Sequence, residues 1–394
     1  MSQTLQELKQ FYQSKLLEEC VPFWLQNGVD KKHGGFFTSL NRDGTVIDTD
    51  KAVWQQGRFT WLLGELFNDP RFAECEGRED WQSNALHGAR FLEQSCIDPD
   101  DGRFWFLIDQ QGDPLRKRRY SFSESFAAIA FGELAQMTGD DRYRVLASKA
   151  FDAFLKSNRQ TANPKFTDTR PLLSLGFPMI TMVTAQQLRE SIALDSADDE
   201  IDSAIENISK LFVKPDLKCV MENVAPNGDV VDHFDGRILN PGHAIEAAWF
   251  LMEEGRIRKE SAWIELGCQM LEWMLERGWD NEYGGLLYFV DVHGLPVQEY
   301  WHDMKFWWPH NEAIIASLLA YELTKNQKYL DMHQRIHQWA FDHFSDPEFG
   351  EWFGYLHRDG RLSVPLKGNH WKGPFHYPRM LLQCIRIIDR ISPG

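Results

Sequence analysis

The sequence predicts an all-α fold in which about twelve helices form an (α/α)6 barrel, with short β-hairpins at one mouth. Three observations support this prediction. A hairpin-like segment recurs along the chain, helical stretches lie between its copies, and the helices alternate between two compositions. Because repeats of a fixed period build units that share one core, we expect a single domain over residues 1–394.

The recurring segment has a short apolar or aromatic run, a turn of glycine with Asp, Asn or His, and a second short run. This order is typical of a β-hairpin. Its copies are spaced by roughly 65 residues, with one gap of double length that holds a degraded copy from Asn163. About six units therefore predict a closed ring. The clear copies begin at Gly34, Asp101, Cys219, Gly284 and Gly350.

The helices expected between these segments differ in composition. Those before a hairpin, such as 258–278, are amphipathic and charged, whereas those after one, such as 240–256 and 307–325, are apolar nearly all round. All-round apolarity indicates burial on every side, so we expect an inner ring of apolar helices inside an outer amphipathic ring. In chain order, the expected helices are 4–27, 50–68, 79–97, 121–139, 141–158, 172–194, 198–213, 240–256, 258–278, 307–325, 327–343 and 373–391.

Two start signals agree with these helices. Asn240 and Pro241 have the order of an N-cap followed by a first helical residue. Ser121 and Glu124 have the spacing of a capping box. Inner helices that begin just after the hairpins should open at the mouth where the hairpins lie.

Composition narrows the function classes. The chain of 394 residues carries a net charge of −16, which disfavours nucleic acid and anionic membrane surfaces as partners. No signal-peptide core or membrane-length apolar run is present in the sequence. Its six cysteines are scattered and never form a CxxC pair, so we expect a cytoplasmic protein.

Polar residues near the starts of the inner helices break the apolar pattern and need an explanation. They lie on separate units, so they can converge on one axial site. A cation in a helix's first turn opposes the helix dipole, so we expect Arg379 to face an acidic partner or a bound oxygen. The residues of this set are Arg58, His243, Glu246, His310, Glu312, His376 and Arg379.

Two imidazoles on opposite sides of one site suit inversion at an acidic carbon, because one can remove a proton and the other return one to the opposite face. Arg58 or Arg379 could stabilise the enediolate oxygen, and Glu246, one turn after His243, could orient that imidazole. His243 and Glu246 also have a spacing found in dimetal sites, but no second such pair accompanies them, so we expect no metal.

At these residues the chain resembles the N-acylglucosamine 2-epimerase family, over about residues 5 to 390. The resemblance implies an (α/α)6 barrel, an isomerase that needs no redox cofactor, and His243 and His376 as the acid–base pair. It also implies that Arg58, Glu312 and Arg379 belong to the essential site and that Glu246 supports His243. The most specific matching segments are NPGHAIEAAWF, KFWWPHNEA and WKGPFHYPR.

This resemblance implies interconversion of N-acetyl-D-glucosamine and N-acetyl-D-mannosamine. ATP as an allosteric activator and a homodimer are carried as expectations from the same family. Since rigid aromatic and polar side chains line sugar sites, we expect a further set to bind the substrate: Trp54, Glu222, Asn240, Trp308, His310 and Trp371.

Three alternatives stay open at this point. The first is an aldose–ketose isomerase that acts on mannose, although the stretch around Phe177 and Pro178 lacks the histidine of the isomerase-like branches. The second is a glycoside hydrolase with Glu246 and Glu312 as its two carboxylates, which leaves the histidines without a role. The third is a non-catalytic binding protein, which leaves the polar constellation unexplained.

Overall fold

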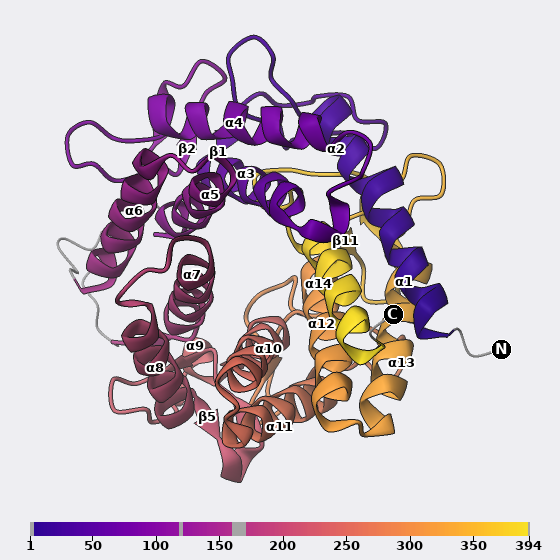
Figure 1. Ribbon diagram of the computed structural model, residues 1–394. Helices are drawn as coiled ribbons and strands as arrows, with labels where there is room; N and C mark the ends of the chain where they lie inside the picture. Colours follow the sequence, from indigo (N-terminus) through magenta and orange to yellow (C-terminus); the bar gives the residue numbers. More distant parts are fainter. Residues whose placement is uncertain (1–3, 118–120, 160–170, 393–394) are drawn as a thin grey trace.

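The computed structural model describes residues 4–117, 121–159 and 171–392, and Figure 1 shows them arranged as a ring of two helical layers. This is the (α/α)6 barrel that the repeat predicts. The inner layer consists of α3 (Val53–Asn68), α5 (Phe122–Thr138), α7 (Gly176–Ile192), α10 (Pro241–Arg258), α12 (Trp307–Thr324) and α14 (His376–Ile391). The outer layer consists of α1 (Leu5–Ser14), a π-helical turn (Lys15–Cys20), α2 (Val21–Asn27), α4 (Arg78–Ser95), α6 (Asp141–Arg159), α8 (Ala197–Asn207) with a π-helical turn (Ile208–Phe212), α11 (Ser261–Gly278) and α13 (Gln327–Phe344).

Burial separates the two layers as the composition predicts. In α12, every residue from Trp307 to Ala320 is buried, so this helix has no solvent face over that span. In its outer neighbour α13, the buried residues recur every three or four positions and form one stripe. The inner ring closes where α14 meets α3: Arg386 of α14 donates to Glu65 of α3 at 2.7 Å.

Short strands join the units. They are β1 (Lys51–Ala52), β2 (Leu107–Ile108), β3 (Pro114–Arg116), β4 (Leu173–Ser174), β5 (Val213–Lys214), β6 (Cys219–Val220), β7 (Asn223–Val224), β8 (Ile238–Leu239), β9 (Val290–Asp291), β10 (Lys305–Phe306), β11 (Tyr355–Leu356) and β12 (Leu362–Val364). A further short helix, α9 (Phe234–Arg237), precedes β8.

Pairing between these strands runs across units. β1, β8 and β10 each lead directly into an inner helix, and they pair antiparallel with β2, β9 and β11 of the following hairpin segment. The copies from Asp101 and Gly350 also close on themselves, as β2–β3 and β11–β12. The copy from Cys219 does not: its β6 pairs with β5 and its β7 with β4. Helices α3, α10 and α12 are therefore each held at their start by the next unit of the chain.

A buried lysine anchors three of these junctions. The ammonium of Lys51 lies 2.8 Å from the carboxylate of Asp30. In the same way Lys305 lies 2.9 Å from Asp280 and Lys367 lies 2.8 Å from Asp346. None of the three lysine side chains has exposed surface. Burying a charge is costly unless it is paired, so these contacts hold each turn firmly against the strand before an inner helix.

Of the two helix starts predicted from capping residues, one is confirmed and the other is wrong. Asn240 caps α10 as predicted, and its side chain accepts a hydrogen bond from the backbone of His243. The capping box at Ser121 is wrong: the Ser121 side chain caps nothing, and Glu124 instead accepts from Arg103 at 2.9 Å. The degraded repeat copy from Asn163 lies mostly outside the described residues. Within the described ranges, no helix combines the length and apolarity needed to cross a bilayer.

Candidate active site

A buried arginine joins two carboxylates at the axial end of the inner helices. One terminal nitrogen of Arg379 lies 2.5 Å from Glu246 Oε1 and 2.6 Å from Glu312 Oε1. These residues belong to α14, α10 and α12, so three separate units meet at one point. Burial disfavours the charged form of Arg379, but the two carboxylates outweigh it and raise its pKa. Arg379 therefore faces acidic partners, as its place in the first turn of α14 predicts.

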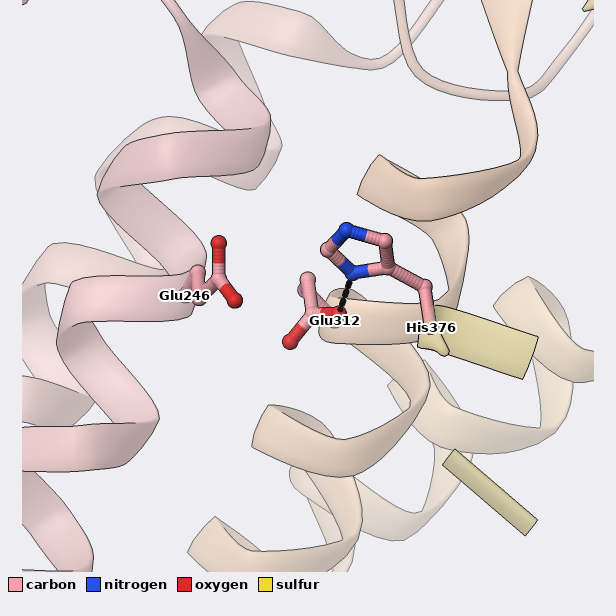
Figure 2. Close-up of side chains that lie close together, drawn as sticks. All are labelled: Glu246, Glu312 and His376. Carbon is pink, nitrogen blue, oxygen red and sulfur yellow. Dashed lines mark hydrogen bonds and ion pairs between the residues drawn. The ribbon is translucent and has the colours of Figure 1, made fainter. Parts of the chain in front are cut away.

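His376, the first residue of α14, is held by Glu312. Its Nδ1 lies 2.7 Å from Glu312 Oε1, and a carboxylate can only accept, so we assign the ring proton to Nδ1. Figure 2 shows Nε2 turned away from Glu312, and no described residue is hydrogen-bonded to it. Burial, reinforced by the charge of Arg379, holds the pKa of His376 well below its ordinary value. His376 is thus a neutral imidazole with an unprotonated nitrogen.

His243, in the first turn of α10, has a different environment. Its Nδ1 lies 3.0 Å from both carboxylate oxygens of Glu222 and 3.1 Å from the side-chain nitrogen of Asn240. Burial lowers the pKa of His243, but the charge and hydrogen bond of Glu222 outweigh that effect, so the net pKa is raised. The hydrogen bond to this imidazole comes from Glu222 and not from Glu246, which binds Arg379, but the charge of Glu246 also helps to raise the pKa of His243.

Trp308 brings the two histidines into one site. Its ring centroid lies 5.0 Å from that of His243 and 5.7 Å from that of His376. One indole therefore contacts both imidazoles, from the second residue of α12. The side chain of His243 is 30% exposed and that of His376 is 9% exposed, so the site opens toward His243.

Arg58, on α3, is a buried cation without a carboxylate partner. Its guanidinium stacks over the rings of Trp54, Phe126 and Phe375, at 4.2 to 4.7 Å from their centroids. Among the described residues it makes no hydrogen bond, and its buried Nε is unpartnered. Burial lowers its pKa to about 9. A buried cation costs free energy unless something pairs with it, so Arg58 is suited to meet a charged or polar group of a ligand.

Aromatic residues stack beside Arg58. Trp54 lies one helical turn before it and donates its indole N–H to the backbone oxygen of His370 at 2.8 Å. The Trp54 ring packs edge-on against Trp371, with centroids 5.4 Å apart, and Trp371 is 38% exposed. This pair stands at the border between the buried cations and solvent, where a sugar ring could be stacked.

His310 lies apart from this site. Its Nε2 accepts from the backbone N–H of Leu286 at 2.8 Å, and its Nδ1 lies 2.7 Å from the backbone oxygen of Phe306. Burial lowers its pKa to about 3. Because both ring nitrogens bind backbone, the geometry gives His310 a structural role and does not support its assignment to substrate binding.

Glu246, Glu312 and His376 also form a group of potential metal ligands, drawn in Figure 2, with donor atoms within 4.8 Å of one another. The charge that a metal ion would supply is already provided here, because Arg379 binds both carboxylates. The Nδ1 proton of His376 also points at Glu312, so this nitrogen is not available as a ligand. The donor set fits an arginine-centred cluster better than a metal.

Comparison with known proteins identifies the family of this chain. The family model described as N-acylglucosamine 2-epimerase (GlcNAc 2-epimerase) matches residues 35–376. The chain belongs to this family. It is 35% identical to the N-acylglucosamine 2-epimerase of Bos taurus, over 95% of this chain and 90% of that protein. The resemblance predicted from the sequence is therefore confirmed.

Solved structures in the same fold class are more distant in sequence. The cellobiose 2-epimerase from Bacillus thermoamylovorans B4167 superposes with a TM-score of 0.82 at 18% identity, over 97% of this chain and 99% of that one. A D-mannose isomerase superposes with a TM-score of 0.81 at 18% identity, over 96% and 98% of the two chains. At this identity they establish the barrel fold and not the substrate of this N-acylglucosamine 2-epimerase family member.

Proposed function

We propose that this protein is an isomerase that interconverts N-acetyl-D-glucosamine and N-acetyl-D-mannosamine by proton transfer at C2 of the ring-opened sugar. The observation that carries this proposal is the pair of imidazoles on one indole: Trp308 contacts both His243 and His376. Each imidazole has a carboxylate at Nδ1, so each presents Nε2 for proton transfer. Relatives named N-acylglucosamine 2-epimerase at 33–35% identity support the same reaction.

The reaction needs no external oxidant or reductant. One histidine takes the C2 proton of the open-chain aldehyde, and the electron pair of the broken C–H bond moves into C1–C2 while the C1 carbonyl becomes an enolate oxygen. The other histidine then gives a proton to C2 from the opposite face, which restores the carbonyl. Arg58, which has no carboxylate partner, is our candidate for stabilising the enolate oxygen.

The two histidines differ in their resting protonation state. His376 is neutral because burial and Arg379 lower its pKa, whereas Glu222 favours the imidazolium of His243. We therefore assign His376 as the base and His243 as the acid for the sugar whose C2–H faces His376. For its epimer the roles are reversed, and the two histidines must first exchange protonation states.

The decisive experiment is NMR in D2O with N-acetyl-D-glucosamine, N-acetyl-D-mannosamine and mannose, each incubated with the protein. Two-base epimerisation places solvent deuterium at C2 of the product epimer. A ketose product from mannose would instead establish aldose–ketose isomerisation, and product that keeps the original C2 hydrogen would exclude proton exchange with solvent.

The histidines are tested separately by His243→Asn and His376→Asn. Each variant should lose epimerisation by at least about 100-fold, since general acid–base catalysis contributes 10²–10⁴-fold. His343→Asn, in the last turn of the outer helix α13 and away from the site, is the matched control and should retain activity. Near-normal turnover in either site variant would remove that histidine from the mechanism.

Four finer expectations belong to this proposal. We propose a cytoplasmic homodimer that requires no cofactor and that ATP activates at a second site. All six cysteines are unpaired thiols, which suits a reducing compartment. Light scattering at several protein concentrations tests the dimer, and epimerase rates with and without ATP test the activation.

A further inference from the structure

Another buried ion pair lies outside the substrate-facing cluster and uses a glutamate from the last hairpin segment. Glu351 accepts hydrogen bonds from the Cys20 thiol at 2.9 Å and the Trp24 indole at 2.8 Å, both at Oε2. Its other oxygen accepts from the Lys372 ammonium at 2.8 Å. The two charged side chains are each 1% exposed. Both oxygens of this carboxylate are therefore occupied by buried donors of the protein.

The backbone at Glu351 is strained to make these contacts. Its φ is +49°, in the left-handed region that non-glycine residues seldom adopt. Such strain persists only where the surroundings impose it. Lys367 contributes to that constraint, since its ammonium donates to the backbone oxygen of Glu351 at 2.8 Å.

Lys372 belongs to the irregular segment 366–375, which leads directly into α14 and His376. Its ammonium also donates to the backbone oxygen of Lys367 at 2.7 Å, so the segment is folded around this one side chain. The fit is close: a Cβ on Gly354 would lie 2.6 Å from Lys372 Cδ. The same ammonium lies 5.8 Å from the ring of Trp307, which in turn packs edge-on against His376.

This contact also lies where the ring closes. Cys20 and Trp24 come from the first outer helices, Glu351 from the last hairpin and Lys372 from the final connection. Nearby, the backbone of Leu40 pairs with that of Lys367 at 3.0 Å, so the first and last units are joined here. The position of α14, and with it the catalytic cluster, depends on this junction.

We propose that Glu351 and Lys372 are positioning residues for catalysis: their buried ion pair holds segment 366–375 so that His376 meets Glu312 with Nε2 directed at the substrate. This inference rests on the proposed function of His376 as a catalytic base. Neither residue touches the reacting atoms. A displacement of about 1 Å in a supporting element can cost about 100-fold in rate.

The test compares Lys372→Met and Glu351→Asp with the wild type. Lys372→Met keeps the apolar stem and removes the ammonium. Glu351→Asp keeps the charge, tolerates the left-handed backbone and shortens the side chain by one methylene, so it retains a folded protein if the first variant does not fold. We expect kcat to fall about 10- to 100-fold in Lys372→Met and less in Glu351→Asp, with little change in KM because Arg58 and Trp308 are untouched.

The readout that separates positioning from simple destabilisation is the protonation of His376. When its contact with Glu312 loosens and water enters, its pKa should rise toward the ordinary value, and the acid limb of the kcat/KM profile should move to higher pH. Glu254→Gln is the matched control, because Glu254 is an equally buried and multiply hydrogen-bonded carboxylate at the opposite end of the barrel. It should lower the melting temperature and leave the acid limb in place.

Histidine-selective ¹⁵N NMR titration, with His376 identified by its absence in His376→Asn, measures the same pKa without turnover. It therefore decides the positioning role even if the wild type epimerises no N-acyl sugar, a result that would overturn the proposed function alone. The positioning role is overturned if both variants lower only the melting temperature and leave the titration of His376 unchanged, as in the control.

Discussion

Helix α10 carries a buried glutamate at each end, and the two are used differently. Near its end, Glu254 accepts four hydrogen bonds, two from Arg189, one from Arg258 and one from Gln186. Near its start, Glu246 accepts one, from Arg379, and its second oxygen has no hydrogen bond from a described residue.

The same contrast holds for the cations at the two ends. Arg189 forms a two-point contact with Glu254, whereas Arg379 serves two glutamates through one nitrogen and leaves its buried Nε unpartnered. Arg58 makes no hydrogen bond to a carboxylate in the described part of the chain, and its Nε is unpartnered. Buried charge by itself therefore does not mark the working end of the barrel. In this comparison the unused donors and acceptors lie at the start of α10, where they can gain a partner when substrate arrives.

The largest expected effect comes from breaking the cluster with Arg379→Met. The change leaves Glu246 and Glu312 as buried, uncompensated anions, so we expect a loss of about 3–5 kcal/mol in the free energy of unfolding together with loss of turnover. Urea unfolding and the epimerase assay measure the two effects. An active variant of normal stability would show that the cluster is neither structural nor catalytic.

Arg58→Met should separate function from stability. Methionine can fill the space between Trp54, Phe126 and Phe375, and the substitution removes an unpaired buried cation, so stability should stay constant or rise. The rate should fall about 10²–10³-fold if Arg58 stabilises the enolate oxygen. The measurement is kcat together with a thermal melt, and a destabilised but active variant would reverse our assignment.

Glu254→Gln should lower the stability of the protein and leave its activity unchanged, the reverse of the result expected for Arg58→Met. It weakens charged hydrogen bonds worth about 1.5–3 kcal/mol each and leaves kcat/KM near the wild-type value. Burial raises the pKa of Glu254, but Arg189 and Gln186 outweigh it and the net pKa is lowered. The stability that this charge adds is thus present above the pKa of an unfolded glutamate and is lost as pH falls through the lowered value. Unfolding curves at pH 7 and in acid should show a difference that shrinks in acid.

The smallest effect is expected from Glu222→Gln. Because Glu222 raises the pKa of His243, its removal should move the alkaline limb of the kcat/KM profile to lower pH. A shift of about one unit corresponds to about tenfold in rate on that limb. Glu254→Gln serves as the charge-matched control, and an alkaline limb that stays in place would assign the acid to another group.

The two helical layers and the position of the site could be predicted from the sequence, because both follow from the periodic pattern of apolar and polar residues. Alternation of amphipathic and all-apolar helices indicates two layers, and polar residues in the apolar layer indicate the site. Helical spacing could also have excluded His310: Trp308 and Glu312 are four residues apart and share a face, so the residue midway between them points to the opposite side.

What could not be predicted involves partners distant in the chain. Pairing of β1 with β2 spans more than one helix, and no local pattern encodes it. Glu222 is predicted only as a substrate ligand, because its contact with His243 depends on how the β7 segment folds back toward α10. The ion pair of Glu351 and Lys372 could not be predicted, because in the sequence each is an ordinary charged loop residue and only the structure shows that both are buried.

The cross-unit strand pairing has a consequence for synthesis. Helices α3, α10 and α12 are each fastened at their start by a strand that leaves the ribosome later, and His376 and Arg379 lie on α14, the last inner helix. If His376 is the catalytic base that we propose, the growing chain cannot turn over sugar until its final helix docks against the first unit. Translation that stops early yields no closed ring, and under our proposal no acid–base pair, so we expect incomplete products to be inactive and to expose unpaired strands, which protein quality control can recognise.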